Sequence, residues 1–144
     1  MKAVFYWAVL LGTVALALAV LAQNPSYQPD AEWRAPAAAA AKRNPLANKP
    51  EAVAGGKKLF LRNCAECHQD DGAGMMKKHS ADFQLPAVQE QSDGSLFWKI
   101  TNGNPDRGMP SFSQLPEMQR WQLVLFLRTL RAPAPENKAE QKSR

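Results

Sequence analysis

The sequence predicts an all-α fold in which a few short helices surround a single core. Apolar residues recur at helical spacing in residues 53–64 and again in residues 116–130, and a shorter helical pattern covers residues 93–102. No segment of the 144-residue chain has the alternation of a convincing strand, and no internal repeat is visible. We therefore expect one helical domain.

The first helix is expected to lead directly into a cysteine motif. Val53, Gly56, Leu59, Phe60 and Cys64 recur at helical spacing, and basic residues occupy other positions of the same turns. This pattern predicts one face for the core and one for solvent.

The two later helices have recognisable ends. Ser92 is the expected N-cap of the helix over 93–102, and Gly103 is its expected stop. The last helix is expected from about Pro116, which suits a first-turn position, to Leu130. Its broad apolar face consists of Met118, Trp121, Val124, Leu125, and Leu127 or Phe126.

The stretch with the most chemical information is Cys64-Ala65-Glu66-Cys67-His68. Two thiols three residues apart, followed by an imidazole, are typical of a covalent attachment site for c-type haem. The thiols can form thioethers with the two vinyl groups on one edge of the porphyrin, and His68 then offers a nitrogen to the iron. We predict one covalently attached haem c, with its iron, and an all-α fold wrapped around it.

A Cys-x-x-Cys pair also occurs in redox dithiols, zinc sites and disulfides. A redox dithiol usually lies in a βαβ context, which is not visible here. Structural zinc needs four ligands, and the chain would have to use both its Cys and both its His, including His79. A disulfide across so short a loop is geometrically tight. Haem attachment is the preferred interpretation.

A haem iron held by one His needs a ligand on its other face. The thioether of Met stabilises ferrous iron and raises the potential. Met109 lies between Gly108 and Pro110 in a stretch rich in helix breakers, where the Gly permits close approach to the ring and the Pro stiffens the chain. We predict Met109 as the second axial ligand. The weaker candidates are Met75, Met76, Met118 and the imidazole of His79.

With these residues, about residues 51–131 resemble the small monohaem, His/Met-ligated (class I) cytochrome c family. That resemblance implies helices around a mostly buried haem with one exposed edge. It also implies that the first helix crosses the last near a right angle, through a Gly and an aromatic residue four positions later. Gly56 and Phe60 match this spacing, with Leu123 and Phe126 as expected partners.

The family often has a Pro soon after the haem motif, whose carbonyl accepts a hydrogen bond from the proximal His. The nearest Pro after His68 is Pro86, eighteen residues on. The sequence therefore does not identify the partner of the His68 Nδ1 atom.

The resemblance implies an electron-transfer protein and not an enzyme. With both axial positions occupied, the iron has no free site for a substrate. We expect a carrier of single electrons between redox proteins, or the cytochrome subunit of a respiratory or dehydrogenase complex. The alternative is a haem peroxidase or gas-binding cytochrome with an open or displaceable sixth ligand, in which Arg107 beside Met109 would act.

The amino terminus predicts export. Residues 1–22 carry one charge, at Lys2, and are either a membrane anchor helix or a signal peptide. The apolar run is long enough to span a bilayer, which favours the anchor, whereas Val20-Leu21-Ala22 suits cleavage. We expect the bacterial periplasm, with an inner-membrane anchor or as a soluble protein after signal cleavage.

The remaining composition divides the chain. Residues 23–50 hold five prolines and an Ala run and are expected to be a linker, although Tyr27 and Trp33 are unusual in a spacer. Residues 51–131 are the expected cytochrome c domain, and 132–144 an expected disordered charged tail. The cytochrome domain holds only +1 of the formal net charge of +5 and lacks a basic stripe, so nucleic acid is not an expected partner.

Overall fold

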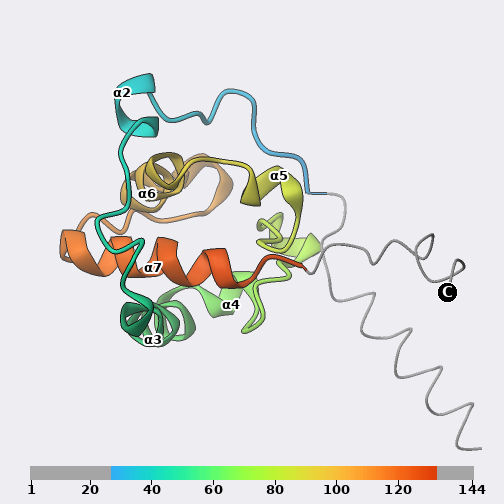
Figure 1. The fold of residues 1–144 in the computed structure, drawn as a ribbon. Coiled ribbons are helices and arrows are strands. Elements are labelled where there is room, and N and C mark those ends of the chain that lie inside the picture. Colours follow the sequence, from blue (N-terminus) through green and yellow to red (C-terminus); the bar gives the residue numbers. More distant parts are fainter. Residues whose placement is uncertain (1–26, 133–144) are drawn as a thin grey trace, which may run out of the picture.

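The structure is a computed structural model that describes residues 27–132 (Figure 1). Within this range it contains no strand, and the only bridge is an isolated antiparallel one between Asn104 and Met109. The predicted all-α fold is confirmed for this part of the chain. The α-helices are α2 (Ala37–Ala40), α3 (Val53–Asn63), α4 (Ala65–His68), α5 (Pro86–Gln89), α6 (Asp93–Asn102) and α7 (Glu117–Thr129). Three short 3₁₀ helices are η1 (Pro50–Ala52), η2 (Met76–Lys78) and η3 (Pro105–Arg107).

The ends of the longer helices follow the sequence signals closely. The Ser92 hydroxyl accepts a hydrogen bond from the Ser95 backbone N–H at 3.1 Å, and α6 stops at Gly103 as predicted. Helix α3 ends one residue before Cys64. Helix α7 has Pro116 as its N-cap and Leu130 as its C-cap, so it lies one residue inside the expected bounds at each end.

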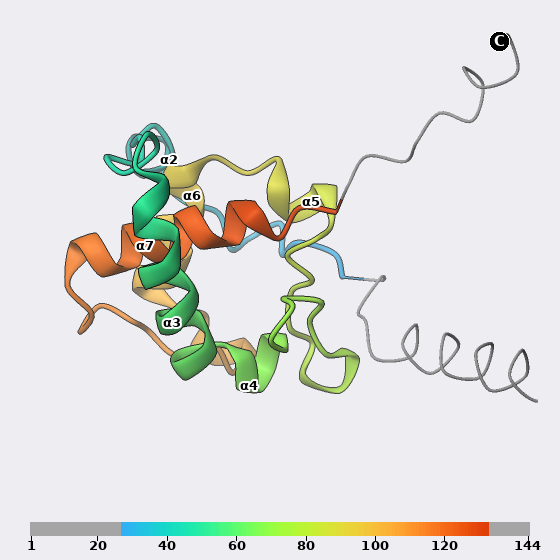
Figure 2. The same ribbon diagram turned by 60° about the horizontal axis from the view of Figure 1, so that its bottom comes forward.

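Helices α3 and α7 cross steeply. In Figure 1 α3 is viewed along its axis while α7 runs across the picture, and Figure 2 shows the same crossing from another side. A β-carbon on Gly56 would lie 2.9 Å from the Phe126 β-carbon, and the Phe60 and Phe126 rings lie 5.2 Å apart. The predicted contact of Gly56 and Phe60 with Phe126 is confirmed.

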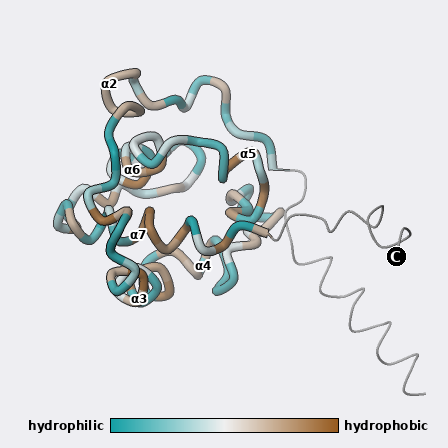
Figure 3. Tube along the Cα trace, viewed as in Figure 1, coloured by the Kyte–Doolittle hydropathy of each residue, from teal (hydrophilic) through white to brown (hydrophobic). Residues whose placement is uncertain are grey.

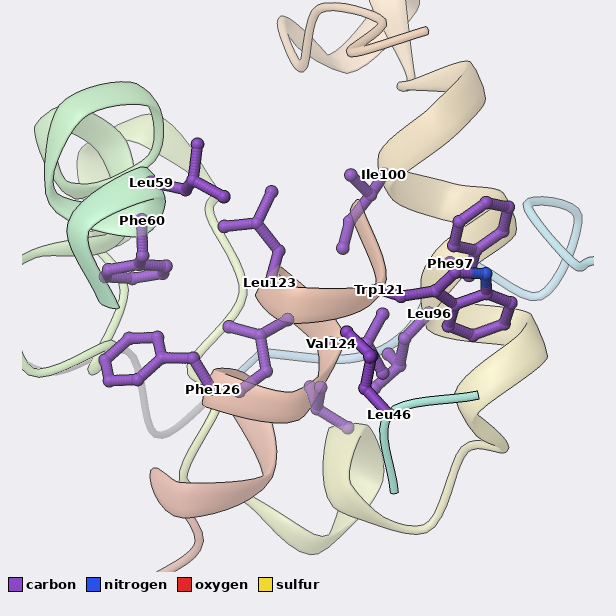
Figure 4. Close-up of a cluster of buried hydrophobic side chains, with 12 residues drawn as sticks. Leu46, Leu59, Phe60, Leu96, Phe97, Ile100, Trp121, Leu123, Val124 and Phe126 are labelled. Carbon is purple, nitrogen blue, oxygen red and sulfur yellow. The ribbon is translucent and has the colours of Figure 1, made fainter. Parts of the chain in front are cut away.

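The core lies where α3, α6 and α7 meet. Figure 4 shows side chains from these three helices pointing toward one another, and Trp121 stacks on Phe97 with ring centroids 4.0 Å apart. Brown and teal stretches alternate along α3 and α7 in Figure 3, as expected of helices with one apolar face. The core residues are Leu46, Leu59, Phe60, Val88, Leu96, Phe97, Ile100, Trp121, Leu123, Val124, Phe126 and Leu127.

The described part of the expected linker, residues 27–50, is packed against the helical core. The Asn44 side chain donates to the Trp121 carbonyl at 3.1 Å, and Leu46 is buried. The Ser92 hydroxyl donates to the Ala40 carbonyl at 2.7 Å, which joins α2 to the start of α6. Proline-rich composition predicted an extended chain but not that this chain lies along its own domain, because the contacts use single side chains without a periodic pattern.

Two predictions fall outside the described residues. These are the apolar segment 1–22 and the charged tail, of which only Ala132 is described. Between residues 27 and 132, no helix combines the length and the hydrophobicity that crossing a membrane requires.

Candidate functional site

The four predicted site residues converge on one cavity. Cys64, Cys67 and His68 line it from the α3–α4 junction, and Met109 lines it from a turn more than forty residues later. The volume of the cavity is about 1200 Å³, which includes solvent space at its open side. Much of the remaining wall is apolar, with Phe60, Phe83, Val88, Leu96, Ile100, Phe112, Leu123 and Leu127.

The two cysteines are presented by the break between α3 and α4. Cys64 is both the residue after α3 and the N-cap of α4, so the chain turns there, and both thiols lie at the cavity as free thiols. Burial, with a smaller effect from Cys67, raises the pKa of the Cys64 thiol to about 12. Reactive redox dithiols need a lowered thiol pKa. The redox-dithiol alternative is therefore not supported.

His68 is buried at the end of α4 and is held by one hydrogen bond. Its Nδ1 lies 2.9 Å from the Ala81 carbonyl oxygen, an acceptor, which assigns the proton to Nδ1 and leaves Nε2 as the free donor to a metal. Burial lowers the pKa of His68, and the bond to Ala81 opposes that effect only in part. The imidazole is therefore neutral, as a metal ligand must be. The acceptor is Ala81 and not Pro86.

A loop after α4 brings Ala81 to His68. The Ser80 hydroxyl donates to the Cys67 carbonyl at 2.5 Å and accepts from the Met75 backbone N–H at 2.7 Å. Phe83 then stacks on the His68 ring, with centroids 4.4 Å apart. The loop thus fixes both the tautomer and the orientation of the imidazole.

Met109 is held by a closed turn. The backbone N–H of Asn104 donates to the Met109 carbonyl at 2.8 Å, and that of Met109 donates to the Asn104 carbonyl at 3.0 Å, with η3 between them. A β-carbon on Gly103 would lie 2.6 Å from the Met109 carbonyl oxygen, so the base of this turn requires a glycine. None of the other described methionines lines the cavity, whereas the exposed His79 does.

Several cavity residues were not predicted from the sequence. Tyr27, Asp30 and Trp33 reach the cavity from the segment expected to be a linker. Lys99, 8% exposed, also lines it, and its Nζ lies 4.6 Å from the centre of the Trp33 ring. Burial lowers the pKa of Lys99, while Asp30 opposes this shift. The two aromatic residues in a Pro-rich segment were the only sequence signal for this contact.

The residues of the cavity fit a covalently attached haem. Two adjacent thiols, a neutral imidazole and a thioether are the side chains that such a group uses, and the apolar wall suits a porphyrin ring. Among residues 27–132, no three His, Cys, Asp or Glu side chains gather as a metal site. The zinc alternative therefore has no support in this part of the chain.

Residues 51–127 match the family model described as "Cytochrome C oxidase, cbb3-type, subunit III". This range contains all four predicted site residues. Among solved structures, the chain is similar to "KustC0563 c-type cytochrome", with 27% sequence identity and a TM-score of 0.49 over 54% of this chain and 98% of that one. No curated protein matches the chain.

Proposed function

We propose, from the premise that this chain belongs to the cytochrome c family of cbb3-type oxidase subunit III, that it carries single electrons between redox proteins. Membership of this family implies covalently bound haem c with its iron. The observation that carries the proposal is the convergence of Cys64, Cys67, His68 and Met109 on one apolar cavity.

Each of the four residues has a separate task in this proposal. Cys64 and Cys67 would hold the haem through thioethers, and His68 and Met109 would bind its iron. When bound, the group supplies one-electron exchange between ferric and ferrous iron. The chain supplies fixed ligands, because the Ala81 carbonyl orients His68 and a closed turn holds Met109. Little has to move when an electron arrives or leaves.

No observation favours the peroxidase or gas-binding alternative. That alternative needs a polar group free to act on a ligand beside Met109, for which Arg107 was the candidate. Arg107 is paired with Asp30, with Nε and Oδ2 3.1 Å apart. Its partner is a residue of the segment that lines the cavity.

We further propose that the domain works in the bacterial periplasm, tethered to the inner membrane by residues 1–22. The uncharged run after Lys2 supports this location, because it is long enough to span a bilayer. The description of the matched family names an oxidase subunit, which supports a place in an oxidase or dehydrogenase complex. Affinity purification from native membranes tests this part of the proposal through the proteins that co-elute.

The visible spectrum and the intact mass of the exported protein test the central proposal. We expect the mass of one covalently added haem and a low-spin spectrum that carbon monoxide changes only slowly. A high-spin iron that binds carbon monoxide at once would favour the gas-binding or peroxidase alternative. A colourless protein without added mass would overturn the assignment of the cavity.

A further inference from the structure

We propose that residues 27–34, which we term the strap, position Met109 and limit access to its side of the cavity. The strap includes Tyr27, Asp30 and Trp33, all of which line the cavity. This inference rests on the proposed role of Met109 as an axial ligand, and it adds positioning residues from outside the matched family range, 51–127.

The strap contacts the Met109 turn at two separated points. The Trp33 Nε1–H donates to the Gly103 carbonyl at 2.9 Å, which lies at the base of the turn. The Asp30 carboxylate pairs with Arg107 at 3.1 Å, near the tip of the turn. Because the turn is fixed at both base and tip, it is restrained against rotation as well as against displacement.

The strap also contacts parts of the domain outside the turn. Tyr27 packs against the hydrophobic core, and burial raises the pKa of its phenol. The ammonium group of Lys99, a residue of α6, lies over the face of the Trp33 ring as a cation–π contact. The strap therefore links the Met109 turn to α6 and to the core.

The turn needs such support because it is short and partly exposed. It is a short loop with η3 inside it, and the Arg107 side chain is 63% exposed. Within the turn, two backbone hydrogen bonds join Asn104 and Met109. A Met thioether is a weak ligand, so an exogenous ligand competes in proportion to the time that Met109 spends displaced. Fixing the turn lowers that fraction.

The test compares haem-loaded, full-length variants of the strap. Asp30→Asn removes the ion pair, Trp33→Phe removes the indole donor but keeps a ring, and a double variant removes both contacts. Glu32→Gln is the matched control, because it makes the same charge change at an exposed position of the strap. The readouts are the far-red absorption band of an iron–thioether bond in the ferric protein, and the rate of carbon monoxide binding to the ferrous protein.

We expect carbon monoxide to bind the double variant about ten-fold faster than the wild type, since each lost contact changes the displacement equilibrium a few-fold. The far-red band of the double variant should weaken, and its urea midpoint of unfolding should change little. Glu32→Gln should leave the band and the binding rate nearly unchanged. Unchanged binding rates and an unchanged band in the double variant would overturn the role of the strap. If the wild type itself lacks the far-red band, the assignment of Met109 fails instead, so the two failures are distinguishable.

Discussion

A β-carbon on Gly56 would lie 2.1 Å from the carbonyl oxygen of Gln122, which is far inside van der Waals contact. Helices α3 and α7 therefore touch backbone to backbone at this point. Since α3 leads into Cys64 and the cavity motif, the crossing also fixes where the two thiols and His68 lie relative to the core.

Gly56→Ala is expected to lower the free energy of unfolding by about 1–3 kcal/mol, because an added methyl group must push the two helices apart. Gly55→Ala is the matched control, since its β-carbon would meet only the flexible end of the Gln122 side chain, at 3.0 Å. Urea unfolding of the haem-loaded protein measures both variants. Equal stabilities for the two variants would show that the helices do not cross this closely.

Met109→Ala is expected to remove the far-red absorption band, lower the reduction potential and admit carbon monoxide rapidly, because a thioether ligand stabilises ferrous iron. Met118→Ala, at a 48% exposed position of α7, is the control and should leave the spectrum unchanged. Absorption spectroscopy and redox titration check both. An unchanged spectrum for Met109→Ala would exclude this residue as a ligand.

Local features of the site were readable from the sequence, and long-range ones were not. Cys64, Cys67 and His68 are adjacent in the chain, and Met109 lies in a stretch of helix breakers, so residue type and spacing were sufficient to select them. The partner of His68 is a backbone carbonyl, that of Ala81. Every residue has the same backbone carbonyl, whatever its side chain. Only the fold can therefore select which carbonyl accepts the bond from His68.

The strap was missed for a related reason. Asp30 and Arg107 are 77 positions apart, and neither lies in a periodic pattern that would place it on a face of a helix. Pro-rich composition correctly suggests extended chain. It does not indicate whether that chain leaves the domain or lies along it.

The stability of the domain should fall as the pH drops through the range just below about 6.5, because burial holds the pKa of His68 below its ordinary value of 6.5. In this window the unfolded chain binds a proton that the folded chain does not. The free energy of unfolding therefore falls by up to about 1.4 kcal/mol per pH unit as the pH decreases.

Urea unfolding at several pH values measures this slope. His79→Gln is the matched variant, because it removes the other, exposed imidazole of the chain and leaves His68 in place. A stability that is flat, or that rises toward pH 5, would contradict this prediction.

Asn44→Ala tests whether residues 27–50 belong to the folded unit. Asn44 is 5% exposed, and its side chain donates to the Trp121 carbonyl at 3.1 Å and accepts from the Leu46 N–H at 2.9 Å. Losing both bonds should lower the free energy of unfolding by about 1–3 kcal/mol, because buried polar groups lose their partner.

Asn48→Ala is the matched control for Asn44→Ala, because Asn48 is exposed in the same segment and the substitution is identical. A free spacer would give the same stability for both variants in urea unfolding, since neither side chain would then contact the core. A loss confined to Asn44→Ala would instead mean that the chain before η1 packs on α7. The Pro-rich segment would then be part of the folded domain and not a spacer that leaves it.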